Sequence, residues 1–255
     1  MLHRFDAMLN GVSFAGLDPA IILTDINEQA PKEDIETASR AIHPGTRLTF
    51  RRRRNLSVRL TFVVREYDPA RRATLMDKIA DWAVDDGWLV LSTRPDQRLY
   101  VHADTLPAMG SSLRWTDDII IALTAYERPY FEARWPVVSV ISEHGSICPL
   151  GTVPEAYVEV DVVNKGAGDL TTLTATCATT RIKLEGLAVP PGEHVRIAYT
   201  DKDVLTITAA GVSALANRTA DSHDDLIAYT RQSNIITVEA DQPVTAEFSA
   251  RGRWR

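Results

Sequence analysis

The sequence predicts a mostly β protein of two domains, with one α-helix in the first domain and none in the second. Three observations lead to this fold class: several short segments alternate apolar and polar residues, one segment has helical spacing, and prolines cluster near the middle of the chain. Alternation indicates half-buried strands, whereas apolar spacings of three and four indicate an amphipathic helix. The 255 residues are enough for two domains with separate cores. We expect domains at 1–135 and 136–255.

The first predicted elements are a short strand pair and a polar segment. Phe5–Leu17 indicates two strands, with Asn10-Gly11 suited to a type I′ turn, and Ile21–Leu23 begins another strand. Asn27–Gly45 is polar and contains prolines, so we expect an extended arm or long loop, which in a compact domain is usually functional. A short helix over Asp34–Ala41 is the alternative.

The clearest strand and the only convincing helix follow each other. Leu56–Arg65 has apolar residues at every second position. In Asp68–Gly87, Asp68 suits the N-cap, Pro69 suits the first helical position, and Gly87 suits the stop. The predicted apolar face of the helix consists of Leu75, Met76, Ile79, Trp82 and Ala83.

The charges of this helix are unusual, because Asp77, Asp81 and Asp85 form a column of like charge at spacings of four residues. One interpretation is a solvated face, and the other is an acidic surface that meets a basic partner. Arg51–Arg54 is a candidate partner, within or between subunits. That run also suits a solvated strand end or a subunit contact, and nucleic-acid binding is disfavoured by the net charge of −6.

The remaining predicted elements are all strands. In the first domain they are Trp88–Ser92, Leu99–Ala103, Ser111–Thr116 and Ile119–Tyr126. In the second domain they are Ala156–Val162, Thr172–Ala178, Arg181–Leu187, His194–Tyr199, Leu205–Ala209, Asn234–Glu239 and Val244–Arg251. Short strands at this spacing, without a helix, predict an antiparallel β-sandwich.

We predict no catalytic, cofactor-binding or metal-binding residue. Ser222-His223-Asp224-Asp225 holds the residue types of a triad, but adjacent residues point apart. Asp201-Lys202-Asp203 lacks the glycine and distal glutamate of an EF-hand, and Asp117-Asp118 suits a turn. The histidines lack metal-ligand spacing, and burial is the better expectation for the five tryptophans than a sugar platform. We therefore expect a protein that is not an enzyme.

Location follows from the same composition. No apolar run is long enough to span a membrane, and the N-terminus lacks the apolar region of a signal peptide, so we expect folding in a cytoplasm. Cys148 and Cys177 are then expected to remain thiols.

In order and spacing, these elements resemble the distal tail proteins of siphophages and related prophages, the siphovirus tail component family. The resemblance covers essentially the whole chain. It rests on Phe5–Leu17, Leu56–Arg65, Asp68–Gly87, Leu89–Ala103, Trp115–Tyr126 leading into Pro129-Tyr130-Phe131-Glu132, Asn234–Val238 and Arg251–Arg255. It implies an N-terminal β-sandwich-like domain with one α-helix and an extended arm, and a C-terminal galectin-like antiparallel β-sandwich. Galectins use His, Asn, Arg and Trp, of which only His194-Val195-Arg196 comes near, so we do not expect sugar binding.

The resemblance also implies a function. Six copies would form a ring that joins the tail tube to the tail hub, with Asn27–Gly45 as the arm that reaches a neighbour. The second domain would carry a receptor-binding protein or tail fibre, and DNA would pass through the ring without specific binding. The protein would work at the virion tail tip, after synthesis and assembly in the host bacterial cytoplasm, without cofactor or membrane. The alternatives are a carbohydrate-binding module that attaches a phage particle or enzyme to the host cell wall, and a β-rich hydrolase.

Overall fold

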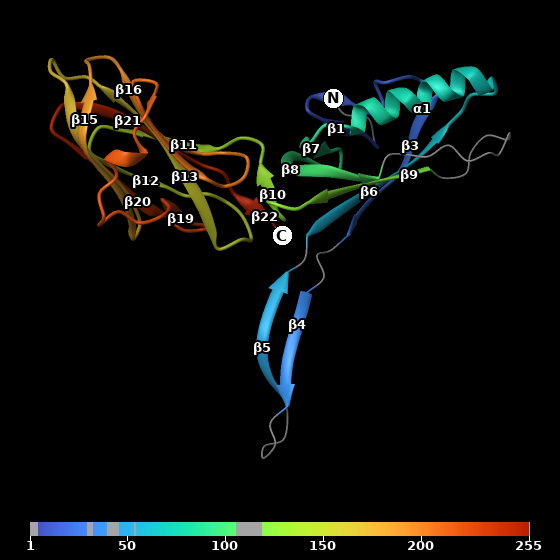
Figure 1. Cartoon of the computed structure of the whole chain (residues 1–255), viewed down its shortest axis with the longest axis horizontal. Helices are drawn as coiled ribbons and strands as arrows, with labels where there is room; N and C mark the ends of the chain where they lie inside the picture. The colour runs from blue at the N-terminus through green and yellow to red at the C-terminus, as the bar shows by residue number, and fades with distance from the viewer. Residues whose placement is uncertain (1–4, 30–32, 40–45, 54, 106–118, 255) are drawn as a thin grey trace. The chain divides into compact units, whose positions relative to one another are not determined.

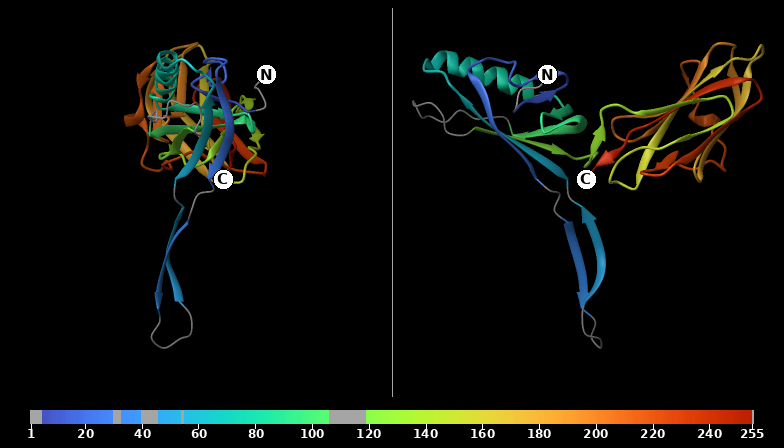
Figure 2. Two further views of the ribbon diagram at one scale, coloured as in Figure 1. Left: turned by 90° about the vertical axis from the view of Figure 1, so that its right-hand side faces the viewer. Right: turned by 180° about the vertical axis from the view of Figure 1, so that it is seen from behind.

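The protein divides into two compact units, Met1–Phe131 (unit 1) and Glu132–Arg255 (unit 2). The computed structural model describes residues 5–29, 33–39, 46–53, 55–105 and 119–254, with the side chains of 33–39 and 46–53 left aside. Strands dominate both units, and the described residues contain one α-helix (Figures 1 and 2). The predicted mostly β fold class is confirmed.

Unit 1 is built on an antiparallel sheet whose strand order is β2-β1-β7-β8-β9-β6-β3. Its strands are β1 (Ala7–Leu9), β2 (Val12–Ser13), β3 (Ile21–Gln29), β6 (Leu56–Val64), β7 (Gly87–Leu91), β8 (Arg94–Thr105) and β9 (Ile119–Ala125). The long strand β8 joins the two halves of the sheet, because it pairs with β7 through Val101 and with β9 from His102 onward. The strand predicted at Ser111–Thr116 lies outside the described residues.

The strand pair predicted at the start of the chain is confirmed. β1 pairs with β2, and the connecting residues Asn10 and Gly11 have φ angles of 49° and 85°. A type I′ turn requires positive φ at both of these positions, which explains the Asn-Gly pair.

Helix α1 (Pro69–Ala83) lies across one face of the sheet (Figures 1 and 2). The Asp68 side chain accepts a hydrogen bond from the Ala70 backbone N–H (3.1 Å), as an N-cap does. The five residues predicted for the apolar face are the buried ones. The Trp82 indole N–H donates to the Val12 carbonyl (2.9 Å), and the Phe14 ring packs edge-on against Trp82 at 5.0 Å.

The predicted role of Gly87 is wrong. The helix ends at Ala83, and Gly87 is the first residue of β7. A Cβ atom at this position would collide with the side chain of Asn10. The glycine is therefore needed for the close approach of β7 to the β1–β2 turn.

The arm is a β-hairpin. Strands β4 (Glu33–Ser39) and β5 (Thr46–Arg53) pair only with each other among the described strands, in a two-stranded antiparallel sheet (Figure 1). The alternative of a short helix at Asp34–Ala41 is wrong for the described part of that range, because residues up to Ser39 belong to β4. The arm also continues past the predicted end at Gly45, through β5. Arg51–Arg53 belong to β5 and not to the following strand, whereas Arg54 lies outside the described residues.

Unit 2 is an antiparallel β-sandwich with the sheets β11-β21-β13-β16-β17-β18 and β12-β20-β14-β15. Its elements are β10 (Phe131–Ala133, which starts at the unit boundary), β11 (Val137–Ile141), β12 (His144–Ile147), β13 (Glu155–Asn164), β14 (Leu170–Cys177), β15 (Thr180–Val189), β16 (His194–Tyr199), β17 (Leu205–Ala209), β18 (Val212–Ser213), the 3-10 helix η1 (Leu215–Asn217), β19 (Ile227–Tyr229), β20 (Asn234–Ala240), β21 (Val244–Ala250) and β22 (Arg253–Trp254). Val160 and Phe248 from one sheet and Ala175 and Leu184 from the other belong to one buried apolar cluster. The predicted sandwich is confirmed.

Two further observations concern the cysteines and the helices. Cys148 and Cys177 are free thiols. Burial raises the pKa of Cys177 to about 12, so this thiol stays protonated and packs as an apolar group. None of the described helices is both long and apolar enough to cross a membrane.

Candidate interaction surfaces

The segment Ser222-His223-Asp224-Asp225 does not form a catalytic triad. The Ser222 hydroxyl donates to the Lys183 carbonyl (3.1 Å), while Nδ1 of His223 accepts from the Arg181 backbone N–H (3.2 Å). Both side chains therefore hold this segment against β15 and not against each other.

The described residues also contain no group of three or more His, Cys, Asp and Glu side chains that could hold a metal. Asp203 has a φ of 56°, as in a turn, and its carboxylate accepts from Arg253 (3.3 Å). The Asp117-Asp118 pair lies outside the described residues.

The His194-Val195-Arg196 segment does not complete a galectin set. Nδ1 of His194 lies 2.8 Å from one oxygen of Asp161, and the Arg196 guanidinium lies 3.4 Å from the other. The hollow beside Arg196 has no Asn or Trp among its lining residues. The hollow is charged, and none of its lining residues is aromatic.

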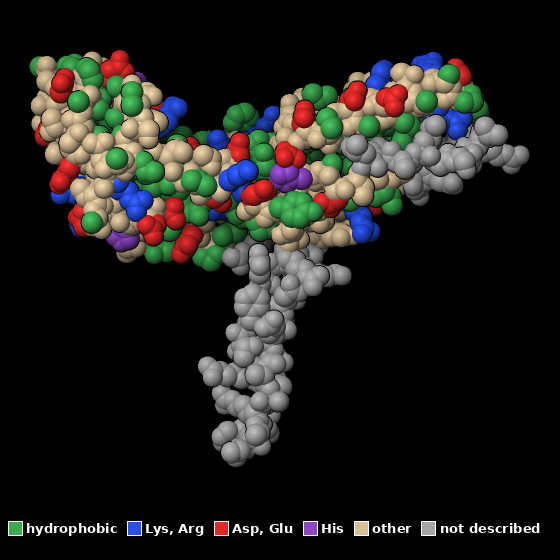
Figure 3. All heavy atoms as spheres, in the orientation of Figure 1, with side chains coloured by type: hydrophobic (Ala, Val, Ile, Leu, Met, Phe, Trp, Pro, Cys, Tyr) green, Lys and Arg blue, Asp and Glu red, His purple; other side chains and the backbone are tan. Residues whose placement is uncertain are grey.

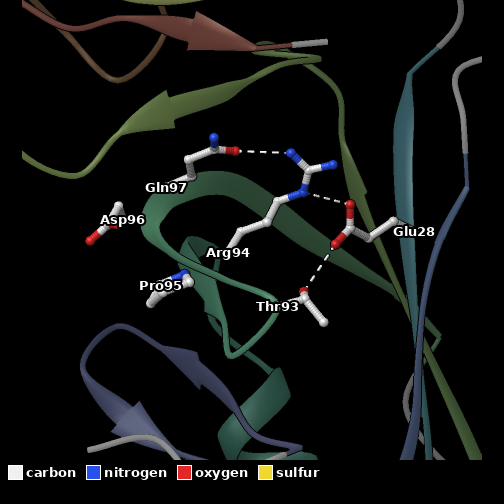
Figure 4. A pocket seen from close by; sticks show the side chains of 6 residues that line it. All are labelled: Glu28, Thr93, Arg94, Pro95, Asp96 and Gln97. Carbon is white, nitrogen blue, oxygen red and sulfur yellow. Dashed lines mark hydrogen bonds and ion pairs between the residues drawn. The ribbon is translucent and has the colours of Figure 1, made fainter.

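An ion pair and its hydrogen bonds lie at the end of β3, where the arm begins. Glu28 is near the end of β3, and its carboxylate accepts from Arg94 Nε (2.7 Å) and from the Thr93 hydroxyl (3.0 Å) (Figure 4). A second nitrogen of Arg94 donates to Gln97 Oε1 (3.1 Å). These residues line an open hollow of about 400 Å³.

The same arginine is fixed from another side, because its guanidinium carbon lies 4.6 Å from the centre of the Phe131 ring. The turn between β7 and β8 thus holds the last residues of β3. Strand β3 leads directly into the arm, so the arm has an anchored base.

A row of rings crosses β7, β8 and the residue after β9. We call Trp88, Tyr100, His102 and Tyr126 the aromatic strip. Successive ring centres are 5.3, 5.6 and 5.7 Å apart, all edge-to-face. The Arg98 guanidinium carbon lies 3.6 Å from the Trp88 ring centre. Rings and arginine in such an array resemble the hot spots of protein interfaces.

His102 is the residue of the strip that contacts two carboxylates. Its Nδ1 lies 2.6 Å from Asp86, in the α1–β7 turn, and its Nε2 lies 2.7 Å from Glu127, beyond β9. Carboxylates only accept hydrogen bonds, so both contacts are satisfied by the doubly protonated ring. Partial burial alone would lower the pKa of His102, but the hydrogen bonds and charges of Glu127 and Asp86 outweigh it and raise the pKa.

A second carboxylate fixes the other end of the strip. Asp104 accepts from the Tyr126 hydroxyl (2.6 Å) and the Thr124 hydroxyl (2.5 Å). The bond to Asp104 raises the pKa of Tyr126. On the face shown in Figure 3, the described acidic and basic side chains are interspersed. Asp104 thus holds Tyr126 in place at one end of the strip.

Sequence reasoning missed the strip and the arm base. Trp88 and Tyr126 are visible in the sequence as an isolated tryptophan and part of an aromatic segment. Only the register that places Trp88 opposite Tyr100 makes them one surface.

The fold and its surfaces define a β-rich protein of two units. No protein-family model matches the sequence. No curated protein sequence matches it. The chain is similar to the solved structure of SPP1 Dit (gp 19.1), described as "a paradigm of hub adsorption apparatus in Gram-positive infecting phages". The TM-score is 0.75 and the identity 10%, with 98% of this chain and 99% of that chain covered.

Two structures of the phage P2 baseplate in its activated conformation, with Ca and with Sr, are also similar. Both have a TM-score of 0.58 and coverage of 98% of each chain, with identities of 8% and 6%. At these identities the likeness concerns the fold. The chain has the distal tail protein fold, and the resemblance inferred from the sequence is confirmed at that level.

Proposed function

We propose that the protein is a structural tail-tip protein of a siphophage or prophage tail. Six copies form a ring that joins the tail tube to the tail hub and to the receptor-binding apparatus. The observation that carries the proposal is the whole-length correspondence, across both units, with the hub protein SPP1 Dit. A fold does not assign a function by itself, so the surfaces described above supply the second support.

The arm gives the ring a means of closure. If the arm of one copy meets a different surface of the next copy, the contact is heterologous, and such contacts form a ring when the rotation between successive copies closes. The Glu28–Arg94 ion pair at 2.7 Å supports this role, because it fixes the strand from which the arm starts. An arm with a fixed base meets its neighbour at a lower entropic cost.

The partners follow from the position in the particle. The ring contacts the tail-tube protein and the tail-associated hub protein, and unit 2 carries a receptor-binding protein or tail fibre. DNA passes through the channel without specific binding, in keeping with the net charge of −6, because phosphate contacts would create affinity. The protein acts at the virion tail tip without catalysis, after assembly in the host bacterial cytoplasm.

Native mass spectrometry and negative-stain imaging of the purified full chain test the proposal. We expect a hexamer with six-fold symmetry and a central hole. A monomer that binds glycans would contradict it and support the carbohydrate-binding alternative.

The acidic column of α1 offers a variant for the same measurement. Asp77, Asp81 and Asp85 are exposed and form no ion pair with the described residues. If the column meets a basic arm of the next copy, changing Asp81 and Asp85 to Lys weakens the hexamer. Unchanged assembly of D81K/D85K at low salt would exclude this contact and leave the hexamer itself untouched.

A further inference from the structure

The larger sheet of unit 2 ends in an apolar strand with a free edge. β11 is the terminal strand of this sheet, so one of its edges has no partner among the described strands. Its Val138 and Val140 are 47% and 61% exposed. Free edges are usually protected by charged residues or proline, and β11 contains neither. An edge of this kind accepts an added strand.

On the outer face of this sheet, the exposed valines of β11 lie beside charged residues of the neighbouring strands. Val140 lies opposite Glu247 on β21, which lies opposite Asp161 on β13. Asp161 in turn lies opposite Arg196 on β16. The neighbouring row contains Val138, Ser249 and Glu159. The residues between them on β13 and β21 are buried, so both rows belong to the outer face of the sheet.

The carboxylates of this face are unequally compensated. Asp161 is paired with His194 and Arg196. Glu159 and Glu247 form no ion pair with any described residue, and Glu247 lies opposite the like-charged Asp161. Like charges at facing positions are destabilising. Both glutamates line a hollow of about 270 Å³. We name Val138, Val140, Glu159 and Glu247 the β11 edge surface.

We propose that the β11 edge surface binds an extended segment of another protein in which apolar residues alternate with Lys or Arg. The free edge supplies backbone hydrogen bonds. The Lys or Arg side chains of the added strand lie on the outer face, where their aliphatic stems pack on the valines and their charged ends point toward the glutamates, while its apolar side chains lie on the opposite face. The partner is not a second copy of this chain, because edge-to-edge pairing would bring the acidic faces of two β11 edge surfaces together. The inference rests on the proposed function, since it specifies what unit 2 carries.

The test measures peptide binding to the full chain by fluorescence anisotropy. The probe is a labelled peptide of about six residues with alternating Val and Lys. Comparison peptides have Glu in place of Lys, or an N-methylated backbone that cannot donate. The variant E159Q/E247Q removes both charges from the surface. Its matched control, E185Q/E193Q, makes the same charge change at exposed positions on β15 and directly before β16.

We expect the lysine peptide to bind and both comparison peptides to fail. E159Q/E247Q should weaken binding about tenfold, whereas E185Q/E193Q should bind like the original protein. Equal loss in both variants, no binding of the lysine peptide, or equal binding of the glutamate peptide overturns the inference. So does binding of a neutral oligosaccharide that E159Q/E247Q abolishes, which would indicate a sugar site.

Native mass spectrometry of the same samples separates the two proposals. A hexamer that E159Q/E247Q dissociates would identify the surface as a self-contact and overturn the inference. Selective peptide binding by a protein that forms no ring would support the inference and overturn the proposed hexamer.

Discussion

The contacts of His102 predict a pH-dependent contribution to the stability of unit 1. The ring holds Asp86 and Glu127 at 2.6 and 2.7 Å, and so connects the α1–β7 turn to the segment after β9. Replacing His102 with Phe keeps an aromatic ring beside Tyr100 and Tyr126 but removes both hydrogen bonds. Each partly exposed ion pair contributes ~0.2–1 kcal/mol, so H102F should lose about 0.5–2 kcal/mol at mildly acidic pH.

The sign of the pH dependence follows from the raised pKa of His102. A histidine whose pKa is higher in the folded state stabilises that state fully below its unfolded-state value of 6.5. The contribution disappears as the pH rises through the higher folded-state pKa. The difference in stability between the original protein and H102F should therefore be largest at about pH 6 and should shrink toward about pH 9.

Hydrogen exchange of residues 126–130 measures this difference locally, after correction for the intrinsic effect of pH on exchange. NMR titration of the His102 ring in the original protein gives the folded-state pKa directly. The control is H144Q, because His144 is exposed on unit 2. If the difference in local stability between the original protein and H102F is the same at about pH 6 and about pH 9, a protonated His102 ring that donates to both carboxylates is refuted.

Two further variants probe the arm base and the β1–β2 turn. Changing Arg94 to Met removes the ion-pair partner of Glu28 and should speed hydrogen exchange at the end of β3. Global stability should change little, because the pair is partly exposed. The control R59M, on the adjacent strand β6, should leave exchange at the end of β3 unchanged. Equal exchange in both variants would show that the ion pair does not fix the arm. Changing Gly87 to Ala forces a methyl group into the neighbouring asparagine side chain and should cost about 1–3 kcal/mol in thermal or urea unfolding. G16A, where a Cβ meets only contacts of 3.4 Å or more, should be much milder, and a G87A as stable as G16A would contradict the close approach.

The elements that the sequence predicted well are those set by local periodicity. Helix α1 has the expected buried face because each of its apolar residues follows another by three or four positions. Strands β16 and β17 begin and end where alternation begins and ends. The Asn10-Gly11 turn is equally local, since its two positive φ angles depend only on those residues.

The surfaces could not be predicted, because they depend on register between strands. Trp88 and Tyr100 are twelve positions apart, and nothing in either segment states that they face each other. β11 was also missed, since its run of apolar residues on an exposed edge lacks the alternation of a half-buried strand. A one-residue shift in either pairing would send these side chains to the opposite face.

The pairing of the arginine run Arg51–Arg54 also depends on strand register and could not be predicted from the sequence. In the sequence, Arg51–Arg54 is a candidate partner of the acidic column of α1. In the hairpin, Arg52 and Arg53 occupy positions opposite Asp34 and Glu33 of the same arm. Opposite charges at facing positions stabilise an antiparallel strand pair, so this register gives the arginine run a local partner in the sequence as well as the acidic column. Because exposed charges are screened by salt, the D81K/D85K variant should weaken the hexamer at low salt and have less effect at high salt.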